Sequence, residues 1–491
     1  MAPRKKCLHG DLTFQVSQHA DEAGFQPEDW RRRRAATVPC GRAPPKNRAP
    51  SKPSGISTFQ GQDDSSLDLL FPAPLVLPGD DLALDPTCPP QSLASWLRGK
   101  HRNKFTADRK TLYVADVPAF SQDVPTTEGW ARPNLVGPKG VKKAKAIDPD
   151  HLTRPNQDDI MEYVEAFYHG IPVKTFTETL EFTTWEPVQK RRAKKDATSS
   201  FVGLRCGSSC TRIRTRPCPD GTFAQQLNLD DILDAAIAAL PDDAYALLLL
   251  TSHDLYEDDD DDFCCGRAYG GSRVAVVSSA RYNPALLLSS RDDSIDLDHT
   301  WPASHCMSYV ARLCGSATAP RGKKRRLGEQ EDESAVSPLH DAVCASNYSS
   351  GVAAAAADHL NTNSALSGLW LCLLARTASH ELGHCLGIAH CVYYACVMQG
   401  TAGMAEDCRQ PPYPCPVCLK KLTHAVREAT EAMSSSSSLS PAGFDEMGHV
   451  ISNYQALARF CDKWKQVGMF AGYKAWLDNL TSQLRGGSFT L

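Results

Sequence analysis

The sequence predicts a mixed α/β protein, because of the pattern of its apolar segments and because its composition is that of a globular chain. Short apolar segments rich in β-branched residues alternate along the chain with amphipathic segments of helical period. The 491 residues are 42% hydrophobic and 22% charged, which is ordinary for a globular protein with a buried core. Lys and Arg number 53 against 57 Asp and Glu. The composition thus excludes a fibrous or wholly disordered chain and does not support a nucleic-acid-coating protein.

The first predicted elements follow residue 110. Residues 111–118 (TLYVADVP) have the composition of a strand, which Pro118 ends because proline cannot continue a ladder. Residues 158–168 predict a helix that Gly170 closes. The apolar face of this helix consists of Ile160, Tyr163, Val164 and Phe167. Residues 171–176 then predict a second strand.

The pattern continues in the second half of the chain. Residues 228–240 predict an amphipathic helix with acidic residues in its first turn. The short apolar runs 246–251 and 273–278 predict buried strands. Together these elements indicate a twisted mixed sheet covered by helices. Residues 448–484 are again helical in period and predict one or two helices packed on the main domain.

Composition divides the chain into four regions. Residues 1–105, which include the basic run 31–34 and a stretch rich in Pro, Lys and Ser, are expected to be mostly disordered or variable. Residues 106–430 are expected to form the main folded domain. A serine-rich linker is expected at 431–447, followed by a C-terminal helical segment at 448–491.

Three charged stretches are expected to be surface insertions, namely residues 190–195, 257–262 and 317–338. The acidic run 257–262 lacks the alternating ligand spacing and the turn glycine of a calcium-binding loop. A solvated loop is therefore the better interpretation of this run.

The N-terminus, the apolar stretches and the cysteines indicate where in the cell the protein is located. The N-terminus is polar, and no apolar stretch approaches the about 20 residues of a membrane span. We therefore expect an intracellular, cytoplasmic protein with no membrane partner; the run 31–34 leaves a nuclear location open. The 19 cysteines are odd in number and too dilute for a disulfide scaffold. In a reducing compartment, clustered cysteines favour metal binding.

One segment carries the chemistry. His380 and His384 lie four residues apart after an apolar helical run, so one helix face presents both imidazoles to a zinc ion. Glu381 lies where a zinc protease needs a general base. Gly387 can end the helix at positive φ and return the chain so that His390 becomes a third ligand. Three protein ligands leave one position open, which is typical of catalytic zinc.

Alternative interpretations of this segment are weaker. The short motif occurs by chance in many proteins, but the added Gly387 and His390 make the pattern specific. In the expected mechanism Glu381 takes a proton from the attacking water and passes it to the leaving amine. A second oxyanion donor cannot be identified, and packing roles are favoured for Tyr393 and Tyr394.

A second metal site is predicted immediately after the third histidine. Two close pairs of cysteines provide four thiolates, as in a closed structural zinc site. These cysteines are Cys391, Cys396, Cys415 and Cys418. Cys408 is the nearby thiol that could replace one of them. Met398 could form an apolar base under the histidines, although a methionine alone is more often part of the core.

The run HELGHCLGIAHC, followed by CVMQG and CPVC, resembles the archaemetzincin family of metzincin-clan zinc metallopeptidases. That family combines the long histidine motif with a cysteine directly after the third ligand, a second cysteine, a methionine and a CxxC pair. The resemblance is tight over residues 380–418 and looser over 110–281. It does not cover the first hundred residues.

The resemblance implies a metzincin-like α/β (α+β) fold, with an active-site helix and a small C-terminal subdomain braced by zinc. It implies two zinc ions, a catalytic one on His380, His384 and His390 and a structural one on the four cysteines. Glu381 would be the general base and Met398 the Met-turn residue. Aminopeptidase-like activity has been associated with the family, and the insertions and the N-terminus leave substrate access open.

Two functions remain as hypotheses. The first is a zinc metallopeptidase that acts on a peptide or protein substrate. The alternative is a non-catalytic, zinc-braced binding or adaptor protein. Glu381 favours the first, because an adaptor has no need of a carboxylate beside an open zinc site. The dispersed basic runs lack interleaved aromatic residues, so no nucleic-acid partner is expected, and we expect a monomer.

Overall fold

The computed structural model describes most of the chain. The described residues are 9–42, 65–100, 102–135, 152–185, 200–289, 295–315, 337–355, 359–434 and 443–487. Among them, no helix has both the length and the apolarity that crossing a bilayer requires.

A five-stranded sheet organises the main domain. Its strand order is β10 (Gly266–Tyr269), β11 (Val274–Ser278), β8 (Ala244–Thr251), β1 (Thr111–Ala115) and β3 (Val173–Thr175). All neighbours pair in parallel except β10, which is antiparallel to β11 and forms one edge. Every residue of β8 is buried, as its run of leucines requires in the centre of a sheet covered on both faces. The four strands predicted from the sequence form within this sheet, and the mixed α/β class is confirmed.

A second, six-stranded sheet lies beside the first. Its order is β2 (Ala119–Phe120), β4 (Leu180–Thr183), β5 (Phe201–Cys206), β6 (Ser209–Arg216), β7 (Gln226–Asn228) and β9 (Asp254–Tyr256). The sequence pattern did not predict this sheet. Its strand β6 is largely exposed and carries three arginines, with Ile213 as its one buried residue, so it lacks the apolar signal of a strand.

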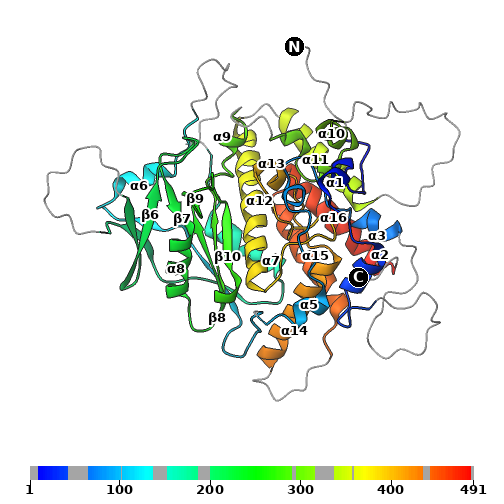
Figure 1. The fold of residues 1–491 in the computed structure, drawn as a ribbon, viewed down its shortest axis with the longest axis horizontal. Coiled ribbons are helices and arrows are strands. Elements are labelled where there is room, and N and C mark those ends of the chain that lie inside the picture. Colours follow the sequence, from blue (N-terminus) through cyan, green and yellow to red (C-terminus); the bar gives the residue numbers. More distant parts are fainter. Residues whose placement is uncertain are drawn as a thin grey trace, which may run out of the picture.

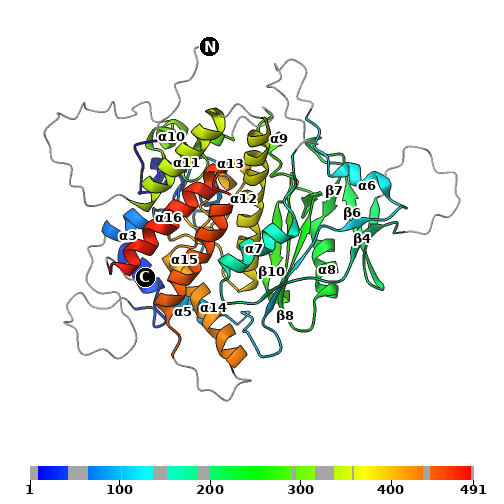
Figure 2. The same ribbon diagram turned by 180° about the vertical axis from the view of Figure 1, so that it is seen from behind.

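Helices separate and cover these sheets (Figures 1 and 2). Helix α8 (Leu229–Ala239) contacts both β11 and β6 and so lies between the two sheets. Helices α7 (Gln157–Phe167) and α12 (His359–Cys385) cover the other face of the five-stranded sheet. The predicted helices at 158–168 and 228–240 thus form with nearly the predicted bounds.

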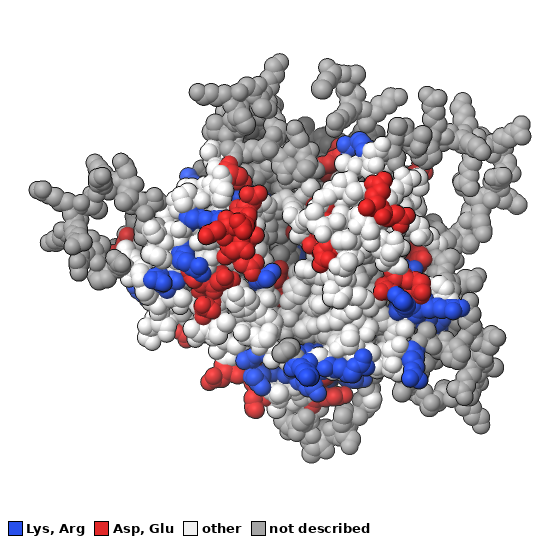
Figure 3. All heavy atoms as spheres, in the orientation of Figure 1, with Lys and Arg blue, Asp and Glu red and all other residues white. Residues whose placement is uncertain are grey.

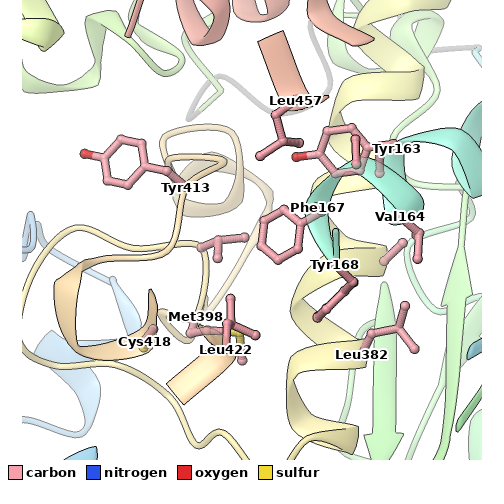
Figure 4. Packing of buried hydrophobic residues seen from close by; sticks show 14 of the residues in the cluster. Tyr163, Val164, Phe167, Tyr168, Leu382, Met398, Tyr413, Cys418, Leu422 and Leu457 are labelled. Carbon is pink, nitrogen blue, oxygen red and sulfur yellow. The ribbon is translucent and has the colours of Figure 1, made fainter. Parts of the chain in front are cut away.

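Further helices pack on the outside of α12 and α7 (Figure 2). They are α11 (Pro338–Ala355), α14 (Pro416–Ser434), α15 (Glu446–Lys463) and α16 (Gly468–Arg485). Figure 4 shows Tyr163 and Phe167 of α7, and Tyr168 directly after it, among Leu382 of α12, Met398 and Leu422. This core holds the metal-motif helix between the sheet and the C-terminal helices.

The short helices occupy the connections. They are α6 (Pro125–Trp130), α9 (Pro284–Leu287), α10 (Met307–Leu313) and α13 (Met404–Asp407), with 3-10 turns at Gly270–Ser272, Leu297–His299 and Ala303–His305.

The N-terminal region is a correction to the expectation of mostly disordered chain over 1–105. Five short helices form there, α1 (Gln18–Ala23), α2 (Trp30–Ala36), α3 (Ser65–Leu70), α4 (Asp81–Leu84) and α5 (Leu93–Leu97). Phe71 and Trp96 are fully buried in the main core. The basic run 31–34 is part of α2, where Arg33 pairs with Asp68. Buried apolar residues such as Phe71 and Trp96 are too widely spaced in the sequence to form a periodic pattern, which explains why the expectation of disorder was wrong.

Of the three predicted insertions, the structure describes the acidic run in full and little or nothing of the other two. Residues 190–195 lie outside the described residues, as do almost all of 317–338. The acidic run 257–262 forms a turn between β9 and β10. The predicted linker 431–447 is shorter than expected, because α14 reaches Ser434 and α15 begins at Glu446; residues 435–442 lie outside the described chain.

Candidate metal centres and active-site cleft

The C-terminal end of α12 presents the histidine motif. His380 and His384 lie one turn apart on the helix, which ends at Cys385. Gly387 follows with a φ of 77°, in the left-handed region that favours glycine. The backbone N–H of Ile388 donates to the Gly383 carbonyl at 3.1 Å and closes the turn. The chain then reverses and brings His390 beside the helix, as the spacing predicted.

The three histidines form one close donor set. One nitrogen from each of His380, His384 and His390 lies within 4.8 Å of the others. The two helical Nε2 atoms are 3.0 Å apart. Two nitrogens bound to one tetrahedral zinc would be about 3.3 Å apart, so this spacing fits a shared metal ion.

Backbone carbonyls orient the two helical imidazoles. Nδ1 of His380 lies 2.7 Å from the Val397 carbonyl, and Nδ1 of His384 lies 2.7 Å from the Ile388 carbonyl. A carbonyl only accepts, so each Nδ1 carries the proton and each Nε2 presents a lone pair. Two lone pairs facing at 3.0 Å repel each other unless a cation lies between them. The residues therefore fit zinc.

Burial keeps these imidazoles neutral. It lowers the pKa of His384 to about 4 and that of His380 well below its ordinary value, and the neighbouring histidines add to both shifts. Burial also lowers the pKa of His390, against the opposing charge of Asp81. The neutral imidazole is the form that binds metal.

Glu381 lies in the wall of the cleft beside the first histidine. The Glu381 side chain is buried. It packs closely against Gly266 of the edge strand β10, because a Cβ atom added to Gly266 would lie only 3.3 Å from Cγ of Glu381. Burial raises the pKa of Glu381 to about 8, with Arg267 opposing and Glu257 adding to the shift. A carboxylate in these surroundings binds a proton readily.

The four predicted cysteines form a second donor set. Cys391, Cys396, Cys415 and Cys418 are buried, and their sulfurs lie within 4.8 Å of one another. The sulfurs of Cys391 and Cys415 are 3.5 Å apart, far beyond a disulfide bond and close to the about 3.8 Å expected across a tetrahedral zinc. Backbone N–H groups of Met398 and Cys415 point at the Cys396 sulfur, which favours a thiolate there. Cys408 is not in this set.

Met398 lies beneath the histidine helix. The side chain is buried, and a Cβ added to Gly383 would come within 2.5 Å of its sulfur. The Met398 carbonyl also accepts the backbone N–H of Cys391 at 2.7 Å. The loop around Met398, here called the methionine loop, therefore packs against the helix and against the segment that carries His390.

A cleft of about 1360 Å³ opens over the histidines. One wall comes from the turn after β9 and from β10, and the other from residues 399–410 and the N-terminal segment. Acidic side chains line both walls, and Figure 3 shows acidic residues on either side of the hollow. In the described chain, the two close groups of His, Cys, Asp or Glu donors are the histidine and cysteine sets, and the acidic turn forms no further one.

Sequence reasoning missed several residues of this cleft. Tyr282 lines it and donates to Asp407 at 2.9 Å, with Thr377 at 2.7 Å from the same hydroxyl. Asp80 and Glu406 line the opposite wall. None of these positions belongs to a local motif, so no sequence signal could have identified them. Tyr393 and Tyr394 are buried, as packing residues would be.

Comparisons with known proteins agree with this geometry. The sequence model of Peptidase family M54 matches residues 343–424. Archaemetzincin-2 of Macaca fascicularis is 25% identical over 80% of this chain and 75% of that protein. Archaemetzincin-1 of Mus musculus is 29% identical over 47% of this chain and 38% of that protein, and archaemetzincin-2 of Rattus norvegicus is 25% identical over 61% and 56%. The chain thus spans about half the length of the first curated relatives that it matches.

Among solved structures, an archaemetzincin from Methanopyrus kandleri is 16% identical, covering 65% of this chain and 97% of that chain, with a TM-score of 0.28. The α/β fold and the histidine set define a candidate zinc site in an open cleft. The chain is similar to archaemetzincins, and the part that matches Peptidase family M54 contains both the histidine and the cysteine set.

Proposed function

We propose that this protein is a zinc-dependent peptidase that hydrolyses peptide bonds in a peptide or protein substrate. The observation that carries the proposal is the convergence of three neutral imidazoles beside a buried Glu381 in the wall of an open cleft. When bound, zinc supplies Lewis acidity, which polarises a carbonyl and lowers the pKa of water.

The chain's own residues supply the remaining chemistry. The carbonyls of Val397 and Ile388 hold the proton on Nδ1 of His380 and His384, so Nε2 stays free to bind. A carboxylate oxygen of Glu381 takes one proton from the attacking water and returns it to the nitrogen of the leaving amine. The proton count balances, and Glu381 is restored.

The cysteine set supports a second, structural zinc in the same proposal. Four buried thiols with no disulfide geometry require a cation to be stable as thiolates. Two zinc ions per chain follow, one catalytic and one structural. A thiolate site of this kind suits a reducing compartment, so we propose an intracellular location. We also propose that the protein is a monomer.

The acidic lining of the cleft favours an aminopeptidase within this class. A free α-amino group is cationic and needs a carboxylate to hold it. Asp260, Asp261 and Asp262 line one wall of the cleft. A carboxylate of this wall is the candidate anchor for a substrate amine.

The test is a peptide-library digest read by mass spectrometry, with wild type, Glu381→Gln and a control, Glu128→Gln. Glu128 is exposed on α6, away from the cleft lining. We expect cleavage by wild type and the control and none by Glu381→Gln, with both zinc ions kept in all three. Removal of single N-terminal residues supports an aminopeptidase, and internal cuts an endopeptidase. No cleavage by metal-loaded wild type would favour the adaptor alternative.

A further inference from the structure

An N-terminal arm, defined as residues 80–97, contacts the turn of the histidine motif. The Gln91 side chain donates to the Gly387 carbonyl at 3.0 Å and accepts the backbone N–H of Ala389 at 3.0 Å. The Trp96 indole donates to the Leu386 carbonyl at 3.0 Å. Side chains from the N-terminal arm therefore form hydrogen bonds with backbone groups of the turn between the second and third histidines. Gln91 and Gly387 are 296 positions apart in the sequence.

The start of this arm is fastened to the loop after Met398. Oε2 of Glu406 accepts the backbone N–H of Asp81 at 2.8 Å and that of Ala402 at 2.8 Å. Arg409 forms an ion pair with Asp80, and both side chains are buried. These contacts fix the position of Asp81 relative to the metal motif.

Asp81 faces the third histidine. A Cβ built on Gly400 would collide with the Asp81 carboxylate and would lie 2.8 Å from Nδ1 of His390. The carboxylate and this ring nitrogen therefore approach the same small space, which is free because residue 400 is glycine. In the described chain, Asp81 belongs neither to the histidine donor set nor to the cleft lining.

We propose that Asp81 is a positioning residue for the catalytic metal site. Its carboxylate accepts the Nδ1–H of His390 through one water molecule, and so leaves Nε2 of that ring for the metal. Backbone carbonyls do the same for His380 and His384. The third histidine, which lies outside the helix, takes its partner from the N-terminal arm. This inference rests on the proposed zinc site.

The carboxylate also changes the strength of the ligand. A negative partner on one ring nitrogen makes the other nitrogen more basic, and loss of such a partner typically lowers metal affinity about 10- to 100-fold. The arm would therefore be part of the active site.

The test measures zinc affinity in the full chain by competition with a chelator. The variants are Asp81→Ala, Asp81→Asn and a control on the same helix, Leu84→Ala, whose side chain is 70% exposed. We expect the histidine site to lose zinc affinity about 10- to 100-fold in Asp81→Ala and less in Asp81→Asn, which keeps an acceptor oxygen without the charge. The control should match wild type. Replacing the catalytic metal with Co²⁺ should give an altered visible spectrum in the Asp81 variants only.

The outcomes separate this inference from the proposed function. Unchanged affinity and Co²⁺ spectrum in both Asp81 variants would overturn the positioning role. If Asp81→Ala lost both metals through misfolding, the folded Asp81→Asn would decide the question by the same two measurements. A wild-type chain that binds no zinc at the histidines would instead overturn the proposed function.

Discussion

His390 and Cys391 are neighbours in the chain, yet their side chains belong to different donor sets. Successive side chains of an extended segment point to opposite sides, so one stretch of backbone serves both sites. The Cys391 N–H donates to the Met398 carbonyl at 2.7 Å and fixes this stretch beside the methionine loop. The segment that enters the cysteine set thus also carries the third histidine.

The first prediction follows from this pairing. His390→Ala should weaken zinc binding at the histidine site without abolishing it, because the two remaining histidines still bind metal weakly. The cysteine site should stay intact, because His390 is not one of its ligands. Cys391→Ser should harm both sites and lower thermal stability, since structural zinc contributes to folding directly. Zinc stoichiometry and melting temperature measure both effects. Loss of both metals in His390→Ala, or full activity in Cys391→Ser, would contradict this arrangement of the shared segment.

The second prediction concerns Gly400. Gly400→Ala should push apart Asp81 and His390 and weaken catalytic zinc binding, because its Cβ has no space between them. Gly403→Ala is the matched control in the same loop, since its Cβ would meet nothing within 4 Å. Chelator competition compares the two variants.

In a double-mutant cycle with Asp81→Ala, the effect of Gly400→Ala should shrink, because the colliding carboxylate is gone. Strict additivity of the two losses would contradict the contact between Asp81 and residue 400.

The third prediction concerns the packing of Met398 under α12. Gly383→Ala should destabilise the fold by about 1–3 kcal/mol, because the added methyl group would lie 2.5 Å from the Met398 sulfur. The control is Gly129→Ala in α6, where a Cβ meets nothing within 4 Å. Urea unfolding measures both. An unfolding free energy of Gly383→Ala equal to that of the control would mean that the methionine loop does not support the helix.

The fourth prediction concerns acid stability. Burial lowers the pKa of His253 to about 4, and the ring lies 2.9 Å from the Thr127 carbonyl. Below pH 6.5 the unfolded state therefore binds a proton that the folded state refuses, so stability falls as the pH drops from 6.5 to about 4. This residue contributes up to about 1.4 kcal/mol per pH unit to that slope.

His253→Gln should flatten the slope by about that amount and keep a donor for Thr127. Urea unfolding over this pH range measures the difference, and release of zinc at low pH affects both proteins alike. Parallel slopes for wild type and variant would disprove the assignment to His253.

The parallel strands could be predicted because their signal is local. The leucine run of β8 and the amphipathic α7 each contain their own pattern within about a dozen residues. The second sheet could not, since strands such as β6 are exposed on one face and carry arginines there. Their stability comes from pairing with distant strands, which a single sequence does not display.

Both donor sets were determined by the sequence itself. Helical geometry places His380 and His384 on one face, Gly387 permits the turn, and the two cysteine pairs are close enough in the chain to share an ion. Only the tertiary structure decided what surrounds them. Gln91 and Asp81 reach the motif from about 300 residues away, with Asp81 and Glu406 separated by 325 positions. Ligand spacing is set by local backbone geometry, whereas such partners are set by the packing of the whole chain.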